Sequence, residues 1–232
     1  MKEAKLSILV ADASIEIVPK ELWGHQSVKS DSKRRRRSPE KILLYLPIHF
    51  RALIDKGYSL EKRGRPDIAH RILLQVLGHP LNKMGLIKDI YVHTIENKIF
   101  WVNPLTRLPL DYYRFEGLIV QLFKEGRVPK DGEEKFMVLL DTRLNDLLKK
   151  YRGNIVLLSR EGVDAWRINL GELLGKLIII GGFQEGEIDK DILGNADIKI
   201  SLGDYTLHAS VAICTFLSMI YMDYIKTSSH KN

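Results

Sequence analysis

Four short runs of large aliphatic residues constrain the fold of this chain more than any other feature. The first is Leu6 to Val10, and the others are Asn154 to Leu158, Lys176 to Ile180 and Ala196 to Ser201. Each run is too short for a helix, and each of the last three ends in a loop that contains glycine. Such runs are typical of buried parallel strands.

Helical patterns alternate with these runs. One predicted helix extends from Pro66 to Gly78, because proline favours a first helical turn and glycine a helix end. A second extends from Asp111, as its cap, to Gly126. A third, from Thr206 to Lys226, is apolar nearly all round and needs a partner, either the sheet or another subunit. Alternating strands and helices predict an α/β fold with a mainly parallel sheet flanked by helices.

The hydrophobic period changes to two between residues 86 and 110. Ile90 and Val92, then Ile99 and Trp101, alternate with polar residues, which predicts a β-hairpin. We expect one domain spanning residues 1–232, with residues 86–110 as a β-hairpin insertion.

The region after the first strand is expected to be less regular. We predict a short helix from Ser14 to Trp23, a strand from Ile42 to Leu46 and a helix from Ile48 to Ile54. Lys29 to Pro39 contains four consecutive arginines and is predicted to be a mobile loop. The run is either a disordered, tail-like patch or a loop that binds a phosphate backbone.

The net charge and the cysteine content restrict the classes of partner and metal site that this chain can have. A formal charge of +7 favours an anionic partner, most often nucleic acid. Cys214 is the single cysteine, which excludes a disulfide framework and a thiolate metal cluster. The longest apolar segment, Ala209 to Met222, falls short of the roughly 20 residues that span a bilayer. We therefore expect a cytoplasmic protein with no membrane partner and no metal.

The turn from Lys62 to Asp67 packs three cations, a glycine and a carboxylate beside the predicted Pro66 helix. Arg63 and Arg65, near free backbone N–H groups at a helix N-terminus, are suited to phosphate. The alternative is a solvated turn beside a surface helix, since charge runs are usually solvated.

Three glycine-containing loops follow the late strands: Leu158 to Gly162, Gly181 to Gly186 and Leu202 to Leu207. Ligands of open α/β sheets bind at the carboxyl ends of strands. Glycine permits close approach to a flat ligand such as an adenosyl cofactor. The spacing fits neither a dinucleotide fingerprint nor a phosphate loop, so NAD and ATP are disfavoured. Alone, however, the glycine pair at 181 and 182 is more often a tight turn.

Several ordered motifs together resemble one family across nearly the whole chain. They are Val10 to Ser14, Val18 to Leu22, Lys62 to Ile68, Pro80 to Lys83, His93-Thr94, Asn103-Pro104, Arg107 to Pro109 and Arg114 to Leu118. The chain is similar to the nucleolar essential protein family of SPOUT-class methyltransferases. These enzymes are specific for N1 of pseudouridine in small-subunit ribosomal RNA and act in ribosome biogenesis. The Lys/Ile-rich composition looks archaeal, whereas a eukaryotic member would be nucleolar.

The resemblance implies a homodimer in which residues 154–226 form a trefoil knot that binds S-adenosylmethionine. It assigns RNA binding to Arg63, Arg65, Arg107 and Arg114, and catalysis to Arg65 and Asp67. Asp67 is either a base or a group that orients Arg65 through a bidentate pair. The implied cofactor-binding residues are Leu158, Ser159, Gly181, Gly186, Leu202, Gly203, Asp204, Tyr205, Thr206 and Leu207.

The chain departs from the family pattern at three places. Leu110 stands where many members have arginine, Arg34 to Arg37 replaces Arg-Arg-Gly-Lys, and Pro47 to Phe50 replaces a His-His pair. The implied reaction is methyl transfer to a base turned out of an RNA loop. The alternatives are an RNA-binding assembly factor without essential catalysis and a SPOUT methyltransferase of another base.

Overall fold

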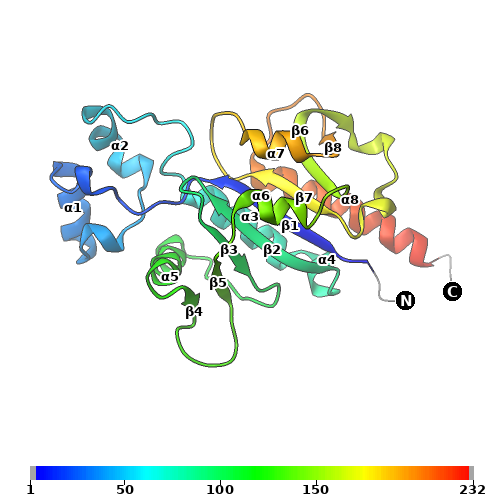
Figure 1. Ribbon diagram of the computed structural model, residues 1–232, viewed down its shortest axis with the longest axis horizontal. Helices are drawn as coiled ribbons and strands as arrows, with labels where there is room; N and C mark the ends of the chain where they lie inside the picture. The colour runs from blue at the N-terminus through cyan, green and yellow to red at the C-terminus, as the bar shows by residue number, and fades with distance from the viewer. Residues whose placement is uncertain (1–3, 230–232) are drawn as a thin grey trace.

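The computed structural model describes residues 4–229 and is built on one eight-stranded sheet (Figure 1). The strand order is β4-β5-β3-β2-β1-β7-β6-β8. The strands are β1 (Leu6–Ala13), β2 (Ile87–Thr94), β3 (Ile99–Val102), β4 (Arg127–Val128), β5 (Met137–Leu140), β6 (Ile155–Asp164), β7 (Leu177–Gly181) and β8 (Ile198–Ser201). The helices are α1 (Gln26–Arg35), α2 (Leu46–Asp55), α3 (Pro66–Gly78), α4 (Pro80–Lys83), α5 (Tyr112–Glu125), α6 (Leu144–Lys149), α7 (Lys190–Asn195) and α8 (Ala209–Ser229).

The sheet has a parallel part and an antiparallel part. Strands β2, β1, β7, β6 and β8 pair in parallel, which confirms the prediction for the four aliphatic runs that form β1, β6, β7 and β8. Strands β3, β5 and β4 continue the sheet in antiparallel pairs. The predicted hairpin is confirmed as β2–β3, and it belongs to this main sheet because β2 also pairs with β1. The fold is therefore a mixed α/β sheet flanked by helices.

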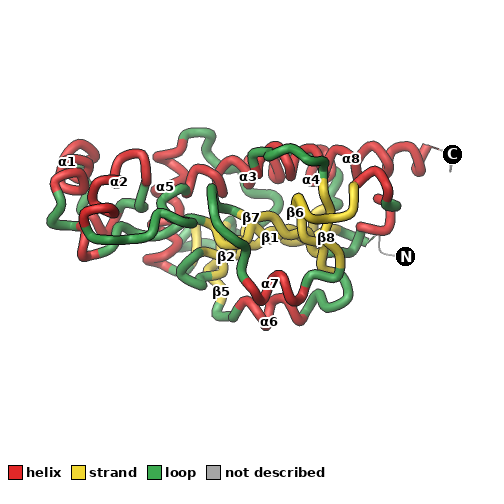
Figure 2. The backbone as a smooth tube through the Cα atoms, turned by 90° about the horizontal axis from the view of Figure 1, so that it is seen from above, coloured by secondary structure: helices red, strands yellow, loops and turns green. Residues whose placement is uncertain are grey.

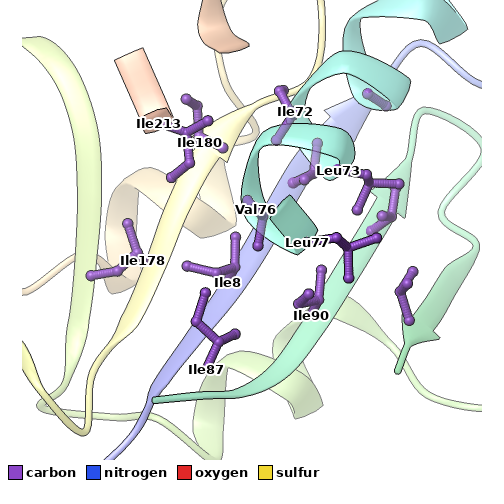
Figure 3. Close-up of a cluster of buried hydrophobic side chains, with 14 of the residues drawn as sticks. Ile8, Ile72, Leu73, Val76, Leu77, Ile87, Ile90, Ile178, Ile180 and Ile213 are labelled. Carbon is purple, nitrogen blue, oxygen red and sulfur yellow. The ribbon is translucent and has the colours of Figure 1, made fainter. Parts of the chain in front are cut away.

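Helices cover both faces of the parallel part. Figure 2 shows α3, α4 and α8 on one side of the sheet and α6 and α7 on the other. All eight residues of β1 are buried, because each face of this strand meets a helical layer. The larger core joins α3 to the sheet, with Ile72 and Val76 above Ile8 and Ile90 (Figure 3). Burying an aliphatic side chain of this kind stabilises the fold by about 1.5–3 kcal/mol.

The last helix, α8, is buried on one side only. Phe216, Leu217 and Ile220 lie in the main core, whereas Val211 and Met222 are exposed. By length and composition alone, α8 is the one helix within the described residues that could cross a membrane, and 22% of its apolar window is buried. A core helix of a soluble protein passes the same test.

Residues 15–60 form an amino-terminal lobe with a small core of its own, and Figure 1 shows α1 and α2 set apart from the sheet. Here three predictions were wrong. The run from Lys29 to Pro39 is mostly helix α1, since buried Asp31 accepts from Arg34 at 2.6 Å and from Arg35 at 2.9 Å, which compensates the clustered charge.

The other two wrong predictions are the strand from Ile42 to Leu46 and the helix from Ser14 to Trp23. Residues 42–46 form no strand of the sheet, because only Leu43 makes a bridge, to Ile17. The helix predicted from Ser14 to Trp23 is reduced to the 3-10 turn Lys20–Leu22, since Ile17 is held extended by that bridge. The predicted helix after these segments is confirmed as α2.

Candidate active site

A cavity of about 650 Å³ lies at the carboxyl ends of β6, β7 and β8, where the sheet geometry predicted a ligand. All three glycine-containing loops reach it. Nine of the ten predicted cofactor residues line it, and Asp204 is the exception. The nine are Leu158, Ser159, Gly181, Gly186, Leu202, Gly203, Tyr205, Thr206 and Leu207.

Two glycines in the wall of the cavity are required by backbone conformation. Gly186 and Gly203 have φ values of 120° and 119°, in a region that side chains strongly disfavour. A Cβ on Gly186 would also lie 2.5 Å from Oε1 of Glu61. These two glycines are therefore more than ordinary turn residues, because a side chain at either position would displace the loops that shape the cavity.

The cavity also has charged and aromatic walls made by residues that were not among the ten predicted cofactor residues. Arg160, Glu161, Glu187 and Lys199 line it together with the ring of Phe183. Lys199 was detectable, since it is the one cation inside the aliphatic run that forms β8. The cavity thus offers apolar surface together with side chains of both charges.

The predicted charged turn before α3 lies beside this cavity. We call residues 62–65 the basic turn and residues 183–189, which include the predicted cofactor residue Gly186, the cofactor loop. Lys62 and Gly64 both adopt positive φ, of 57° and 61°. A Cβ on Gly64 would lie 2.8 Å from the backbone N of Leu46, so the turn is fixed against the start of α2. The turn is a rigid element and not a solvated segment.

Arg65 is held by a carboxylate in the first turn of α3. Its Nε and Nη2 atoms donate to Oδ1 and Oδ2 of Asp67 at 2.8 and 3.0 Å, in a bidentate pair. Arg65 Nη1 also donates to Oε1 of Gln184 in the cofactor loop. Hydrogen bonding to Asp67 raises the pKa of Arg65 above its ordinary value, so the guanidinium stays charged.

Arg63 is held by a second carboxylate. Its Nη2 atom lies 3.1 Å from Oε2 of Glu16, and its guanidinium stacks 4.6 Å from the ring centroid of Tyr58. Glu16 is 1% exposed, and burial raises its pKa to about 7 even though Arg63 lowers it. Within the described chain, Glu16 Oε1 and Arg63 Nη1 are buried and have no hydrogen-bond partner.

A third carboxylate, Asp12, lies at the end of β1 and is 4% exposed. Burial alone would raise its pKa, but hydrogen bonds from His93 and Lys62 outweigh burial and hold the pKa below its ordinary value. Asp12 lies within one of the motifs that resemble the family, yet no role was predicted for its side chain. Its position at the carboxyl end of a buried parallel strand was the available signal.

The second pair of predicted RNA-binding arginines is placed differently. Arg107 and Arg114 are exposed, and neither forms an ion pair within residues 4–229. His70 on α3 bonds to the carbonyl oxygen of Pro109 at 2.8 Å and stacks on Phe115 at 4.3 Å. This histidine therefore joins the α3 start to the segment that carries both exposed arginines.

Helix α1 is anchored to the same segment. Arg35 Nη1 lies 2.5 Å from Oε2 of Glu116 on α5, and both side chains are almost completely buried. His49 lies 3.4 Å from Asp31, and burial lowers the pKa of His49 to about 4. Within the described residues, no group of three or more His, Cys, Asp or Glu side chains could hold a metal ion.

The comparison with known proteins agrees with this geometry. The family model described as "EMG1/NEP1 methyltransferase" matches residues 8–220. The chain belongs to this family. It is 35% identical over 221 residues to the Nep1 ribosomal RNA small subunit methyltransferase of Staphylothermus marinus, covering 92% of this chain and 93% of the relative.

Other members are similarly close to this EMG1/NEP1 chain. The corresponding enzyme of Saccharolobus solfataricus is 36% identical over 214 residues, covering 92% of this chain and 95% of that protein. The crystal structure of Archaeoglobus fulgidus Nep1 bound to S-adenosylhomocysteine superposes with a TM-score of 0.79 at 34% identity. It covers 98% of this chain and 100% of that chain.

Proposed function

We propose that this chain is an S-adenosylmethionine-dependent methyltransferase that modifies N1 of a pseudouridine in small-subunit ribosomal RNA. The observation that carries the proposal is the contact between the lined cavity and the basic turn, in a member of the EMG1/NEP1 family. Methyl transfer to RNA requires that the cofactor lie next to the target base. A cofactor site in contact with a cationic, RNA-facing element meets this requirement. A cytoplasmic location and a role in ribosome biogenesis are proposed with it.

The cavity fits the cofactor. Its volume of about 650 Å³ lies within the range of about 300–1,000 Å³ that small-molecule sites occupy. Apolar side chains such as Ile180 and Leu207 suit an adenine ring, and Lys199 with Glu187 offers charges complementary to an amino-acid group. The bound cofactor supplies a methyl group made electrophilic by its sulfonium.

The chain itself has to hold the target base and tolerate the loss of its ring proton. Arg65, oriented by Asp67 and Gln184, presents a fixed positive charge beside the cavity, which favours the deprotonated ring nitrogen. The bidentate geometry supports orientation as the role of Asp67 rather than proton abstraction, because both carboxylate oxygens are already occupied by Arg65. Arg107 and Arg114 would position phosphates.

A knotted cofactor-binding part over residues 154–226 is proposed on the pairing of β6 with β8. Ile200 in β8 has two Cα partners in β6, Leu158 and Val163. A Cβ on Gly162 would lie 2.5 Å from the backbone N of Ile200. Residues 159–162 therefore bulge out of the β6–β8 pairing and lie tightly against β8, and this close approach supports the proposal that one segment passes through a loop of the other. Threaded chains are rare, so this arrangement is a specific feature.

A homodimer is proposed on the exposed side of α8. A groove of about 570 Å³ runs along this helix and is lined by Trp166, Leu170, Met219 and Met222. Contiguous apolar surface of this kind usually marks an interface. Sedimentation should give a dimer at micromolar concentration, and a stable monomer would contradict this part of the proposal.

The proposed reaction is tested with two RNA stem-loops that differ only in one loop position, which is pseudouridine in one and uridine in the other. Each is incubated with the protein and S-adenosylmethionine, and the nucleosides are analysed by mass spectrometry. We expect methylation of the pseudouridine RNA alone. Methylation of the uridine RNA would indicate another target base, and RNA binding without methylation would indicate an assembly factor.

A further inference from the structure

Asp12 joins the basic turn to the cofactor loop through a single carboxylate oxygen. Its Oδ2 atom accepts a hydrogen bond from Nζ of Lys62 at 2.8 Å and another from the backbone N of Asp189 at 2.8 Å. Asp12 has a left-handed φ of 50°, and the pairing of β1 with β2 shifts register between Val10 and Ala13. The irregular backbone thus places a carboxylate between two segments that are distant in sequence.

The other oxygen of this carboxylate is engaged as well. Oδ1 of Asp12 lies 3.2 Å from Nδ1 of His93, and Nε2 of His93 lies 3.1 Å from Oδ1 of Asn97. The Asp12 side chain is therefore held on both sides. It cannot rotate to follow one segment without breaking its contact to the other.

Direct contacts between the two segments surround this bridge. The backbone N of Lys62 donates to the carbonyl oxygen of Glu185 at 3.2 Å, and Lys62 Nζ lies 4.9 Å from the centroid of the Phe183 ring. Gly186 packs on Glu61 with no room for a Cβ, and Arg65 bonds to Gln184. Phe183 and Gly186 also line the cavity, so these contacts connect the cavity wall to the turn that carries Arg63 and Arg65.

We propose that Asp12 is a positioning residue that couples cofactor binding to RNA binding, so that each ligand raises the affinity for the other. A ligand that fixes the position of the cofactor loop also fixes the position of the rigid basic turn beside the cavity through Lys62, so the second ligand meets a site that is already aligned. The inference rests on the proposed function, because it takes S-adenosylmethionine and RNA as the two ligands. It adds a coupling between their sites.

The test measures RNA affinity by fluorescence anisotropy, using the labelled pseudouridine stem-loop with and without saturating S-adenosylhomocysteine. For the wild type we expect the dissociation constant to fall about fivefold or more, the lower end of usual coupling. Calorimetric titration of S-adenosylhomocysteine, with and without RNA, must show the same factor, because coupling of binding is reciprocal.

Two variants address the bridge itself. Asp12→Asn is tolerated at a left-handed φ and keeps an acceptor for the Asp189 N–H group while it removes the charge that holds Lys62. Lys62→Met keeps the aliphatic stem and removes the ammonium. If Asp12→Asn fails to fold, this variant alone tests whether the Asp12–Lys62 contact carries the coupling. We expect the coupling factor to fall towards one in each, and the double variant to lose no more than either single variant.

Matched controls come from the exposed pair Lys149 and Asp146 on α6, whose charged atoms lie 3.1 Å apart. Lys149→Met and Asp146→Asn should leave the coupling factor unchanged. A purely structural role for Asp12 would lower thermal stability or both single-ligand affinities with the ratio preserved, and that result would overturn the inference. A wild-type ratio of one would also overturn it. Absence of S-adenosylhomocysteine binding by the wild type would instead overturn the proposed function.

Discussion

The two basic regions of this protein, the basic turn and the segment that carries Arg107 and Arg114, use arginine in opposite ways. Arg63 and Arg65 are about three-quarters buried, and each is paired with a carboxylate that is almost fully buried. Arg107 and Arg114 are exposed and free of ion pairs within the described chain. Paired arginines are fixed in space, whereas exposed ones are mobile and screened by salt. This difference supports our proposal that the first region positions a reacting group and the second holds a phosphate backbone.

The largest effect is expected from Arg63→Met, which leaves Glu16 buried without its partner. Breaking a buried pair typically costs about 3–5 kcal/mol, and we expect about 3 kcal/mol at pH 8 because Glu16 can escape by taking up a proton. Urea unfolding measures the loss. At pH 5.5 the loss should be smaller, and Lys149→Met should cost little at either pH. An equal loss at both pH values would show that the pairing of Arg63 is not electrostatic.

Glu16→Gln tests the same site through its pH dependence. Burial raises the folded-state pKa of Glu16 to about 7, above the ordinary value of 4.5, so the folded protein binds this proton more tightly than the unfolded chain. The stability that Glu16 contributes is therefore present below pH 4.5 and lost as pH rises through 7. The stability of the wild type relative to Glu16→Gln should fall by a few kcal/mol across this window. A constant difference would show that Glu16 ionises normally.

Asp67→Asn separates the two roles considered for this carboxylate. If Asp67 orients Arg65, the variant loses one charged hydrogen bond, and RNA affinity should fall by about 1.5–2 kcal/mol. Methylation in a single turnover at saturating RNA should also fall, but by less than in Arg65→Ala, because the variant misplaces the Arg65 charge without removing it. Normal RNA binding with a collapsed single-turnover rate would instead identify Asp67 as a base. No change in either quantity would exclude both roles.

The smallest effect is expected from Arg114→Ala, with Arg107→Ala as its partner. Each should lower the slope of RNA affinity against salt by about 0.7–0.9, the value for one lost phosphate contact. Folding stability should change by less than about 0.5 kcal/mol, because neither side chain is buried. Anisotropy titrations at several salt concentrations measure the slope. A change in sequence preference with an unchanged slope would indicate base contacts instead of phosphate contacts.

Much of this arrangement could be predicted from local sequence pattern. The aliphatic runs identified β1, β6, β7 and β8, because strands covered on both faces need no polar alternation. The glycine-containing loops after three late strands predicted where a ligand would lie, and nine of the ten cofactor residues implied by the family resemblance line the cavity at that place. These features depend on residues that are near one another in the chain.

The errors arose where distant residues decide the structure. The run from Lys29 to Pro39 was predicted to be a mobile loop, yet most of it is helix α1, which ends at Arg35. Asp31 on the same helix and Glu116, which lies 81 residues away, together neutralise Arg35. Asp12 was given no role, because its partner Asp189 is 177 positions away in the sequence. No hydrophobic period or local motif encodes such pairings.

The division between a reacting turn and an RNA-holding segment is tested most directly by single-turnover methylation of the pseudouridine stem-loop, with RNA and S-adenosylmethionine both saturating. Saturation removes differences in affinity, so the rate reports positioning at the reacting base. Arg65→Ala should lower this rate by about 100-fold or more, as loss of a preorganised charge does. Arg114→Ala should stay within about twofold of the wild type, because a phosphate contact that binds ground and transition states equally does not alter this rate. Equal losses in the two variants, or a larger loss for Arg114→Ala, would contradict the account.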